Sequence, residues 1–434
     1  MKEPAANVTR LLTNLRADFP ASIVVFLVAL PLCMGVAIAS GVPAVSGLVA
    51  GIVGGLVVGT LAGSPLQVSG PAAGLTVIIY EFVRHEGLEK LGLLVLLAGL
   101  MQLIAGILKQ GQWFRAVSPS VIKGMLAGIG VLILGSQFHV MFDAGPKQNG
   151  LKNLTAMPES VATVLPLRPF GSAAERQAQR QRLALLQGVL ARQSQLATNS
   201  SRLVVASESD SPAAAERLQK AMSEQSQIVE TLNTFETSAT TPTPTHQQAL
   251  LKLSSAVQVF KTRRFQDLHE SQAEAVTALK ALLDEQKSPS SAALVGLLTL
   301  VTLVGWNSFR PPQLKVLPGS LVAVLVGTGV AMIFELPVLR VAILDSLIEG
   351  IQLLSLGQAP QLLEGKLWMN AAVVAIVASA ETLLCATAVD QLHTGPRTRY
   401  DKELVAQGIG NMLCGVLGAL PMTGVIVRSS ANLQ

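Results

Sequence analysis

Residues 67–74 read QVSGPAAG, and residues 421–432 read PMTGVIVRSSAN. Only a short helix fits after the first stretch, over residues 75–82, and Pro71 suits the first turn of that helix because proline needs no backbone donor there. In the second stretch an extended β-branched piece leads to Ser429–Ala431, which can cap a new helix. Either stretch alone can be an ordinary loop. A pair of interrupted segments in corresponding halves is instead typical of transporters built from inverted repeats.

The sequence around these stretches is that of a membrane protein. Hydrophobic residues make up 50% of the chain and charged residues 14%, and the mean hydropathy is +0.50. A soluble domain has about a quarter of its residues charged. A bilayer core takes roughly 20 helical residues, and seven runs approach that length, which excludes a single signal peptide. The runs are Ser22–Ser40, Ala44–Ala62, Leu91–Leu108, Val121–Phe138, Ala292–Trp306, Leu317–Phe334 and Met369–Val389. We therefore expect an all-α polytopic membrane protein, in which irregular backbone is buried in protein or lines a cavity.

The charged loops predict an orientation with the N-terminus in the cytoplasm and the chain in the inner membrane. When the spans are counted from a cytoplasmic N-terminus, three basic loops fall inside, as the positive-inside rule requires. A net acidic loop at about 335–367 falls outside. The basic loops carry Lys109, Arg115, Lys123, Arg310, Lys315, His393, Arg397, Arg399 and Lys402.

Residues 168–290 differ from the rest, being rich in Gln, Ala, Ser, Glu and Arg. Leucines at helical spacing predict amphipathic helices, and Thr240–Thr245 reads as a linker between two of them. We interpret this block as an extracytoplasmic helical hairpin or coiled coil rather than a ligand-binding domain. The predicted organisation is thus 1–167 with membrane helices 1–5, the insert 168–290, and 291–434 with membrane helices 6–10.

Two charges lie inside apolar segments. Glu381 follows Ala371–Ala380, and a carboxylate inside a membrane helix by default faces a cavity and has a function. Arg428 lies beside the predicted helix start. A snorkelling helix-end glutamate and an interfacial arginine are the alternatives. Two half-helix N-termini of about +0.5 charge each, with Arg428 and an ionised Glu381, would give a site of about +1, or about +2 when Glu381 is neutralised. Such a site favours a small anion and suggests coupling to protons or sodium.

Other chemistries find little support. Cys33, Cys385 and Cys414 lie in apolar stretches as packing residues, and no metal, cofactor or nucleic-acid site is expected. Serine–histidine pairs, paired intramembrane aspartates and HExxH motifs are absent, so an enzyme is not predicted. A nucleobase carrier of similar architecture and a membrane-anchored interaction protein that works through the insert remain alternatives.

Several motifs resemble the SulP family of inorganic anion transporters (sulfate and bicarbonate permeases). Its pattern for helices nine and ten resembles Lys402-Glu403-Leu404, Ala406–Asn411, Pro421, Thr423-Gly424 and Arg428-Ser429. The start of the chain, Asp18–Ala21 with Leu30-Pro31, and Ser69-Gly70-Pro71 fit as well. The resemblance covers both hydrophobic blocks and leaves residues 168–290 outside. The variants are most similar to the bacterial branch often associated with carbonic anhydrases.

The resemblance implies a secondary active transporter that works by alternating access, with seven-plus-seven inverted repeats, discontinuous helices 3 and 10, and a homodimeric assembly. Its substrates would be sulfate, bicarbonate or related anions. The anion-binding residues would be Ser69, Gly70, Pro71, Ala72, Ala73, Arg428, Ser429, Ser430 and Ala431. The coupling ion, H+ or Na+, would lie at Glu381, Cys385 and Gly424.

Three departures from the family pattern affect the expectations. Leu32 stands where a glutamine is common after the first-helix proline. Cys385 and Ile426 stand where sodium-coupled bicarbonate carriers have threonines, which favours protons over sodium. The sequence ends at Gln434, so we expect a form truncated just after the start of helix 10, lacking four spans and any C-terminal STAS domain.

Overall fold

The structure is a computed structural model. It describes residues 4–111, 119–144, 150–164, 172–207, 211–237, 243–311, 314, 317–341, 351–354 and 356–432. These residues fall into two compact units. The first unit takes residues from 1–160, 297–327 and 343–434, and the second takes residues from 161–296 and 328–342.

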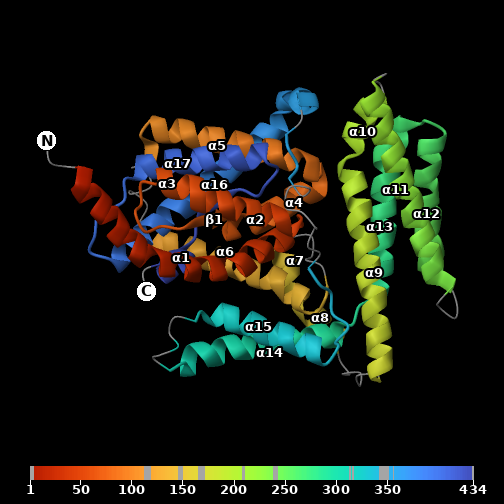
Figure 1. The fold of residues 1–434 in the computed structure, drawn as a ribbon, viewed down its shortest axis with the longest axis horizontal. Coiled ribbons are helices and arrows are strands. Elements are labelled where there is room, and N and C mark those ends of the chain that lie inside the picture. Colours follow the sequence, from red (N-terminus) through yellow and green to blue (C-terminus); the bar gives the residue numbers. More distant parts are fainter. Residues whose placement is uncertain are drawn as a thin grey trace. The chain divides into compact units, whose positions relative to one another are not determined.

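The first unit is built from long apolar helices and one pair of very short strands (Figure 1). Its N-terminal elements are α1 (Pro4–Ala39), α2 (Ala44–Val53), the π-helical turn η1 (Gly54–Val58), α3 (Gly59–Leu61), β1 (Ser69–Pro71), η2 (Ala73–Leu75), α4 (Thr76–Glu86), η3 (Leu88–Lys90), α5 (Leu91–Ile107), α6 (Pro119–Met141) and α7 (Gly150–Thr155). Its C-terminal elements are η7 (Leu356–Leu363), α16 (Gly365–Leu392), α17 (Tyr400–Val416), β2 (Met422–Gly424) and α18 (Ile426–Asn432).

Three further helices contribute residues to both units. They are α8 (Met157–Ala162), α14 (Pro289–Phe309) and α15 (Gly319–Ile333).

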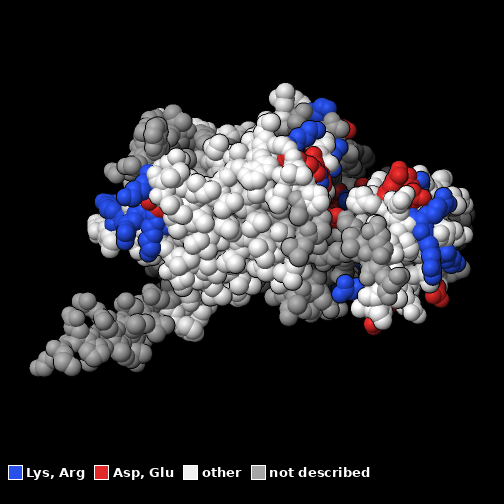
Figure 2. Space-filling view, turned by 90° about the horizontal axis from the view of Figure 1, so that it is seen from above, with Lys and Arg blue, Asp and Glu red and all other residues white. Residues whose placement is uncertain are grey.

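Among the residues that the structure describes, five helices are long and apolar enough to cross a membrane. They cover Ser22–Ala39, Ala44–Leu61, Leu88–Ile107, Pro289–Phe309 and Gly365–Leu392, and Gly130–Met141 and Gly319–Ile333 are shorter apolar helices. Each of these segments overlaps one of the seven apolar runs of the sequence. Figure 2 shows a broad uncharged face on this unit, with charged side chains toward its edges, as expected for a surface in contact with lipid.

The end of α1 shows how the sequence stops a membrane helix. Gly41 adopts a φ of +72°, which residues other than glycine rarely adopt. Its N–H bonds to the carbonyl of Ile38 at 3.0 Å, and the N–H of Val42 bonds to the carbonyl of Ala37 at 3.0 Å. This is a Schellman cap, and Pro43 then starts the connection to α2.

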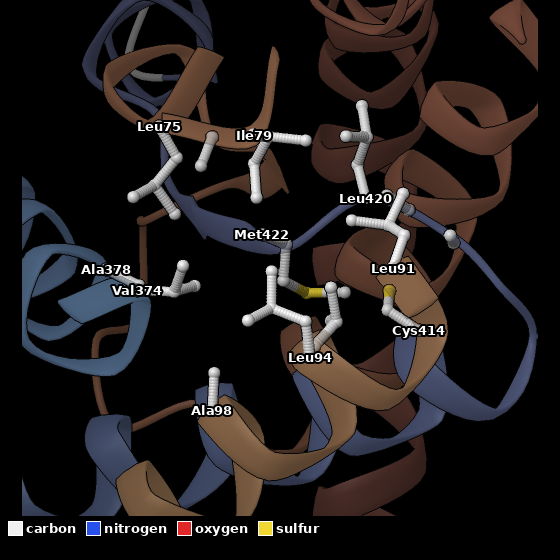
Figure 3. Packing of buried hydrophobic residues seen from close by; sticks show 14 of the residues in the cluster. Leu75, Ile79, Leu91, Leu94, Ala98, Val374, Ala378, Cys414, Leu420 and Met422 are labelled. Atoms are coloured by element: carbon white, nitrogen blue, oxygen red, sulfur yellow. The ribbon is translucent and has the colours of Figure 1, made fainter. Parts of the chain in front are cut away.

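Helices α5 and α17 of the first unit lie side by side (Figure 1). Glycines allow the close approach. A Cβ atom on Gly408 would lie 2.5 Å from the backbone nitrogen of Leu103 and 2.9 Å from the carbonyl oxygen of Gly99. Small facing residues let membrane helices pack at backbone distance. Leu94 of α5, Cys414 of α17 and Met422 of β2 belong to one buried cluster (Figure 3).

The second unit is a bundle of polar-faced helices. It contains α9 (Ala173–Thr198), α10 (Ser200–Ser207), α11 (Pro212–Thr237), α12 (Pro244–Lys261), η5 (Phe265–Asp267) and α13 (Leu268–Gln286). The leucines predicted at helical spacing form its core, including Leu183, Leu232 and Leu279. Residues 240–242 of the expected linker at Thr240–Thr245 lie outside the described residues. From Thr243 onward the chain caps and begins α12.

A ring of three buried glutamines crosses this core. Gln193 donates to Gln272 at 2.5 Å, Gln272 donates to Gln225 at 2.9 Å, and Gln225 donates to Gln193 at 2.9 Å. Each side chain is fully buried and belongs to a different helix. Every amide therefore gives and receives one hydrogen bond, which removes the cost of burying polar groups.

Candidate functional site

The two irregular segments picked out from the sequence pair with each other. Strands β1 and β2 are antiparallel, with Ser69 opposite Gly424, Gly70 opposite Thr423 and Pro71 opposite Met422. The pairing extends at both ends, through Val425 N–H to Val68 O at 2.9 Å and Ala72 N–H to Pro421 O at 3.0 Å. Segments about 350 residues apart in the sequence thus meet inside the first unit.

Proline fits this strand pair because of the alternation of the ladder. Hydrogen bonds at positions 68 and 72 place position 71 at a non-hydrogen-bonded site, where its amide would point away from the partner strand. Pro71 therefore loses no ladder bond. The sequence had placed Pro71 in the first turn of a helix. That prediction is wrong, since the helix begins at Ala73 with η2, two residues later.

The second helix also begins elsewhere than predicted. Residues Ser429–Ala431 were expected to cap it, whereas α18 already begins at Ile426 and ends at Asn432. Ser429 and Ser430 lie inside it. The reason is that Val425 closes the strand ladder, so the chain can turn into a helix directly after it.

The strand pair has two faces, because residues opposite one another in an antiparallel pair point to the same side. We call the side with Gly70 and Thr423 the front face, and the side with Ser69, Pro71, Met422 and Gly424 the back face. The front face meets Arg428 and Glu381. The back face meets helix α17.

Arg428 is a buried cation at the front face, with 2% of its surface exposed. Its guanidinium lies over Gly70, which has no side chain to block it. One terminal nitrogen contacts Cys33 Sγ of α1 at 3.2 Å, and Nε is buried without a partner. Among the described residues no carboxylate forms an ion pair with it. A buried charge without a partner is costly.

Glu381 of α16 lies at the start of the helical segment after β1. Its Oε1 accepts a hydrogen bond from Gly74 N–H at 3.2 Å. Its Oε2 is buried without a hydrogen bond, as is the hydroxyl of Thr423, although the two groups lie close to each other. An amide of this helix start is therefore used by a carboxylate of the protein itself. The residue as a whole is partly exposed, while its carboxylate oxygen Oε2 is buried.

The other predicted site residues lie around these two charges. Ser69 and Ala72 are buried and Ala73 is partly buried at the turn into η2. Cys385, one turn after Glu381, lies 4.0 Å from the hydroxyl of Ser429. Gly424 is on the back face, and its N–H donates to Thr382 at 3.3 Å rather than pointing to Glu381. Of Ser430 and Ala431 only the position within α18 is described.

Sequence reasoning missed a polar stripe on α17. Glu403, Gln407 and Asn411 are spaced by four residues and therefore share one helix face, and all three are buried. Asn411 receives the Met422 N–H at 2.7 Å and donates to the Met422 carbonyl at 3.1 Å, so it satisfies backbone groups that the ladder leaves outward. The spacing of these polar residues in an apolar helix was a signal that could have identified the stripe.

Comparisons with known proteins agree with this architecture. The model of the sulfate permease family matches residues 15–169 and 251–434. The match includes residues 251–290, which the sequence analysis had placed outside the resemblance, so that boundary is corrected. The structure is similar to the transmembrane domain of a cyanobacterium bicarbonate transporter BicA, with a TM-score of 0.59 and 20% identity, covering 97% of this chain and 77% of that one.

Curated relatives point the same way. The chain is 25% identical over 427 residues to the putative sulfate transporter YvdB of Bacillus subtilis, covering 98% of this chain and 56% of that protein. It is 27% identical over 163 residues to the bicarbonate transporter BicA of Picosynechococcus sp., covering 35% of this chain and 29% of that protein. The chain thus spans about half or less of the length of these relatives, which are transporters and not enzymes. With a family match over most of its residues, the chain belongs to the sulfate permease family.

Proposed function

We propose that the protein carries a small inorganic anion, sulfate or bicarbonate, across the membrane as a secondary active transporter that works by alternating access. The observation that supports this most directly is Arg428, a buried guanidinium with a free Nε and no carboxylate partner among the described residues. It lies over Gly70 of β1, where the two broken helices meet. An inorganic anion supplies the missing negative charge and accepts hydrogen bonds from the free N–H groups of Arg428.

Uptake of labelled sulfate and bicarbonate into proteoliposomes that contain the full-length protein tests this proposal. Removing one member of a buried, hydrogen-bonded charge pair costs about 2–5 kcal/mol, so Arg428→Gln should lower uptake at low anion concentration about 30-fold or more. Arg428→Lys keeps the charge and should retain part of the uptake. Arg264→Gln, at a side chain 72% exposed in the second unit, is the control. Uptake unchanged in Arg428→Gln would refute the assignment.

We further propose that Glu381 carries the coupling ion. An ionised Glu381 already accepts the Gly74 N–H at the front face, so an incoming anion meets a carboxylate in the same region. A proton or cation on Glu381 removes that repulsion. Protons are favoured, because the neighbouring position one turn on is the thiol of Cys385, and sodium prefers oxygen ligands such as carboxylates, carbonyls and water.

Measuring uptake with a proton gradient and with a sodium gradient separates proton coupling from sodium coupling. In the wild type, uptake should increase with an inward proton gradient and respond weakly to sodium. In Glu381→Gln uptake should no longer depend on the gradient, since the amide mimics the neutral acid. A variant that keeps the full gradient dependence would show that Glu381 is not the coupling group. If sodium alone stimulated uptake by the wild type to the same extent, the coupling ion would be sodium rather than the proton.

The orientation and assembly are also proposals. The basic loops support an N-terminus in the cytoplasm and a place in the inner membrane, and the family resemblance supports a homodimer. Protease protection of an N-terminal tag in inside-out and right-side-out vesicles tests the orientation. Cross-linking of the full-length protein in membranes tests the dimer.

A further inference from the structure

A thiol lies against the buried cation of the candidate anion site. Cys33 of α1 is 3% exposed, and its Sγ accepts a hydrogen bond from a terminal nitrogen of Arg428 at 3.2 Å. The two residues are 395 positions apart in the sequence. The apolar stretch around Cys33 predicts a packing residue, whereas the structure gives its sulfur a charged partner. Among the described residues no other side chain accepts a hydrogen bond from this guanidinium.

Close packing of α1 against α2 fixes the position of this thiol. A Cβ atom on Gly47 would lie 2.1 Å from the carbonyl oxygen of Cys33, and a Cβ atom on Gly51 would lie 2.5 Å from its Sγ. Both glycines belong to α2. Their missing side chains let the two helices approach at backbone distance and leave room for the sulfur. The thiol is therefore in contact with both α2 and the guanidinium of Arg428.

The guanidinium is held at two places. One terminal nitrogen bonds to Cys33, and the other lies over Gly70 of β1, where a Cβ atom would be 2.0 Å from it. A guanidinium is planar, so fixing both terminal nitrogens also fixes the direction of the third N–H group. That group is Nε of Arg428, which is buried without a hydrogen bond.

A thiol has the chemistry that this position requires. It is uncharged and a weak acceptor, so it orients the guanidinium and leaves the positive charge of Arg428 in place. A carboxylate here would form an ion pair with Arg428 and cancel that charge. An apolar side chain would leave the guanidinium free to turn away from β1. Holding a binding group in position before the ligand arrives lowers the entropy cost of binding.

We propose that Cys33 is a positioning residue for the anion, because it holds the Arg428 guanidinium over Gly70 with the free Nε and the charge available to the ligand. The proposal rests on the anion transport proposed above. Cys33 acts through Arg428, so its loss should weaken anion binding rather than slow the transport cycle.

The kinetics of uptake separate these two effects. The full-length protein in proteoliposomes is assayed with labelled sulfate and labelled bicarbonate, and KM and Vmax per molecule of folded protein are measured. Cys33→Ala removes the acceptor and should raise KM about fivefold, the effect of one weak hydrogen bond to a charged group, while Vmax stays the same. Cys33→Ser restores an acceptor and should keep KM within about twofold of the wild type.

Cys414→Ala is the matched control. Cys414 of α17 is also fully buried, and it belongs to the cluster around β2 without contacting Arg428. The same sulfur atom is removed in both alanine variants, so a loss of packing alone would lower the amount of folded protein and leave KM unchanged. An unchanged KM in Cys33→Ala, or an equal rise of KM in Cys414→Ala, overturns the proposal.

A glycine variant moves the thiol without removing it. The Cβ atom of Gly51→Ala would meet Sγ of Cys33 at 2.5 Å, so the sulfur has to leave its place beside Arg428, and KM should rise as it does in Cys33→Ala. In the double variant the sulfur is absent, and the nearest atom to the new Cβ is the Cβ of residue 33 at 3.9 Å. The second substitution should then add nothing. A further rise of KM in the double variant overturns the role of the thiol.

Failure of the positioning role differs from failure of the proposed function. If the wild type takes up neither sulfate nor bicarbonate, anion transport itself is wrong. If Arg428→Gln loses uptake while Cys33→Ala keeps the KM of the wild type, Arg428 binds the anion without help from Cys33. If Cys33→Ala does not accumulate, Cys33→Ser and Gly51→Ala decide between the outcomes. A raised KM in Gly51→Ala alone supports the proposal, and equal values in the two variants overturn it.

Discussion

Replacing Gly408 by alanine tests the packing that supports the site. The added Cβ would lie 2.5 Å from Leu103 N, 2.8 Å from Leu103 Cα and 2.9 Å from Gly99 O. All three are backbone atoms, so no side chain can rotate away. Helices α5 and α17 would have to separate by about 1 Å, and a gap of that size forfeits a quarter to a half of each van der Waals contact.

The expected loss follows from these contacts. Overpacking in a core typically costs about 1–3 kcal/mol, and the close backbone contacts place Gly408→Ala at the upper end. Alanine favours the helix by about 1 kcal/mol over glycine, which leaves a net destabilisation of about 2 kcal/mol. Because α17 also carries Glu403 and Asn411, uptake should fall together with stability.

Thermal unfolding of the purified full-length protein in detergent measures the effect. Gly188→Ala in α9 is the matched control, since nothing lies within 4 Å of its added Cβ, and it should be neutral or stabilising by about 1 kcal/mol. A melting temperature of Gly408→Ala at or above that of the wild type would refute the close packing of α5 and α17.

Three other changes have defined outcomes. Gln193→Leu leaves one donor and one acceptor of the glutamine ring unpaired and should cost about 2–3 kcal/mol, whereas leucine at Gln193, Gln225 and Gln272 together should recover most of that loss. Thermal unfolding of the wild type, the single variant and the triple variant measures this, and equal losses in the two variants would contradict the ring. Asn411→Leu strips two buried backbone groups of β2 of their partners and should cost about 2–4 kcal/mol and reduce uptake, and a wild-type melting curve would count against this contact. Ser172→Ala removes the capping box of α9 and should cost about 1 kcal/mol, without changing uptake; an unaltered melting temperature would argue that the cap contributes nothing.

Much of the membrane architecture could be predicted from hydropathy. The apolar runs correspond to helices because a chain in lipid must satisfy its backbone hydrogen bonds internally. The length of each run then decides whether it is counted as a membrane span. Glu381 and Arg428 could be identified for a similar reason, since charges are rare in such helices. The structure places both at the front face of the same strand pair.

Details that depend on tertiary contacts could not be predicted. Pro71 has the same sequence signature in a helix start and at a non-hydrogen-bonded strand position, and only the partner strand decides between them. Glu403 lies near the start of its helix, next to Lys402 and Asp401, where a carboxylate usually faces water. The four-residue spacing of Glu403, Gln407 and Asn411 marks a polar stripe but does not show that Glu403 is buried. Its burial depends on Gly63 and Ser64, which lie more than 300 residues away in the sequence.

The pairing of β1 with β2 has a consequence for biosynthesis. The two strands lie about 350 residues apart, and at roughly 5–20 residues per second the ribosome needs about 20–70 s after making β1 before β2 exists. During that interval the polar backbone around β1 has neither its partner strand nor the α17 side chains that bind it. Each such group is costly in lipid, so the nascent first half must be sheltered, by the insertion machinery or at the bilayer surface, until the second half arrives. Assembly of the site therefore waits until β2 has been made.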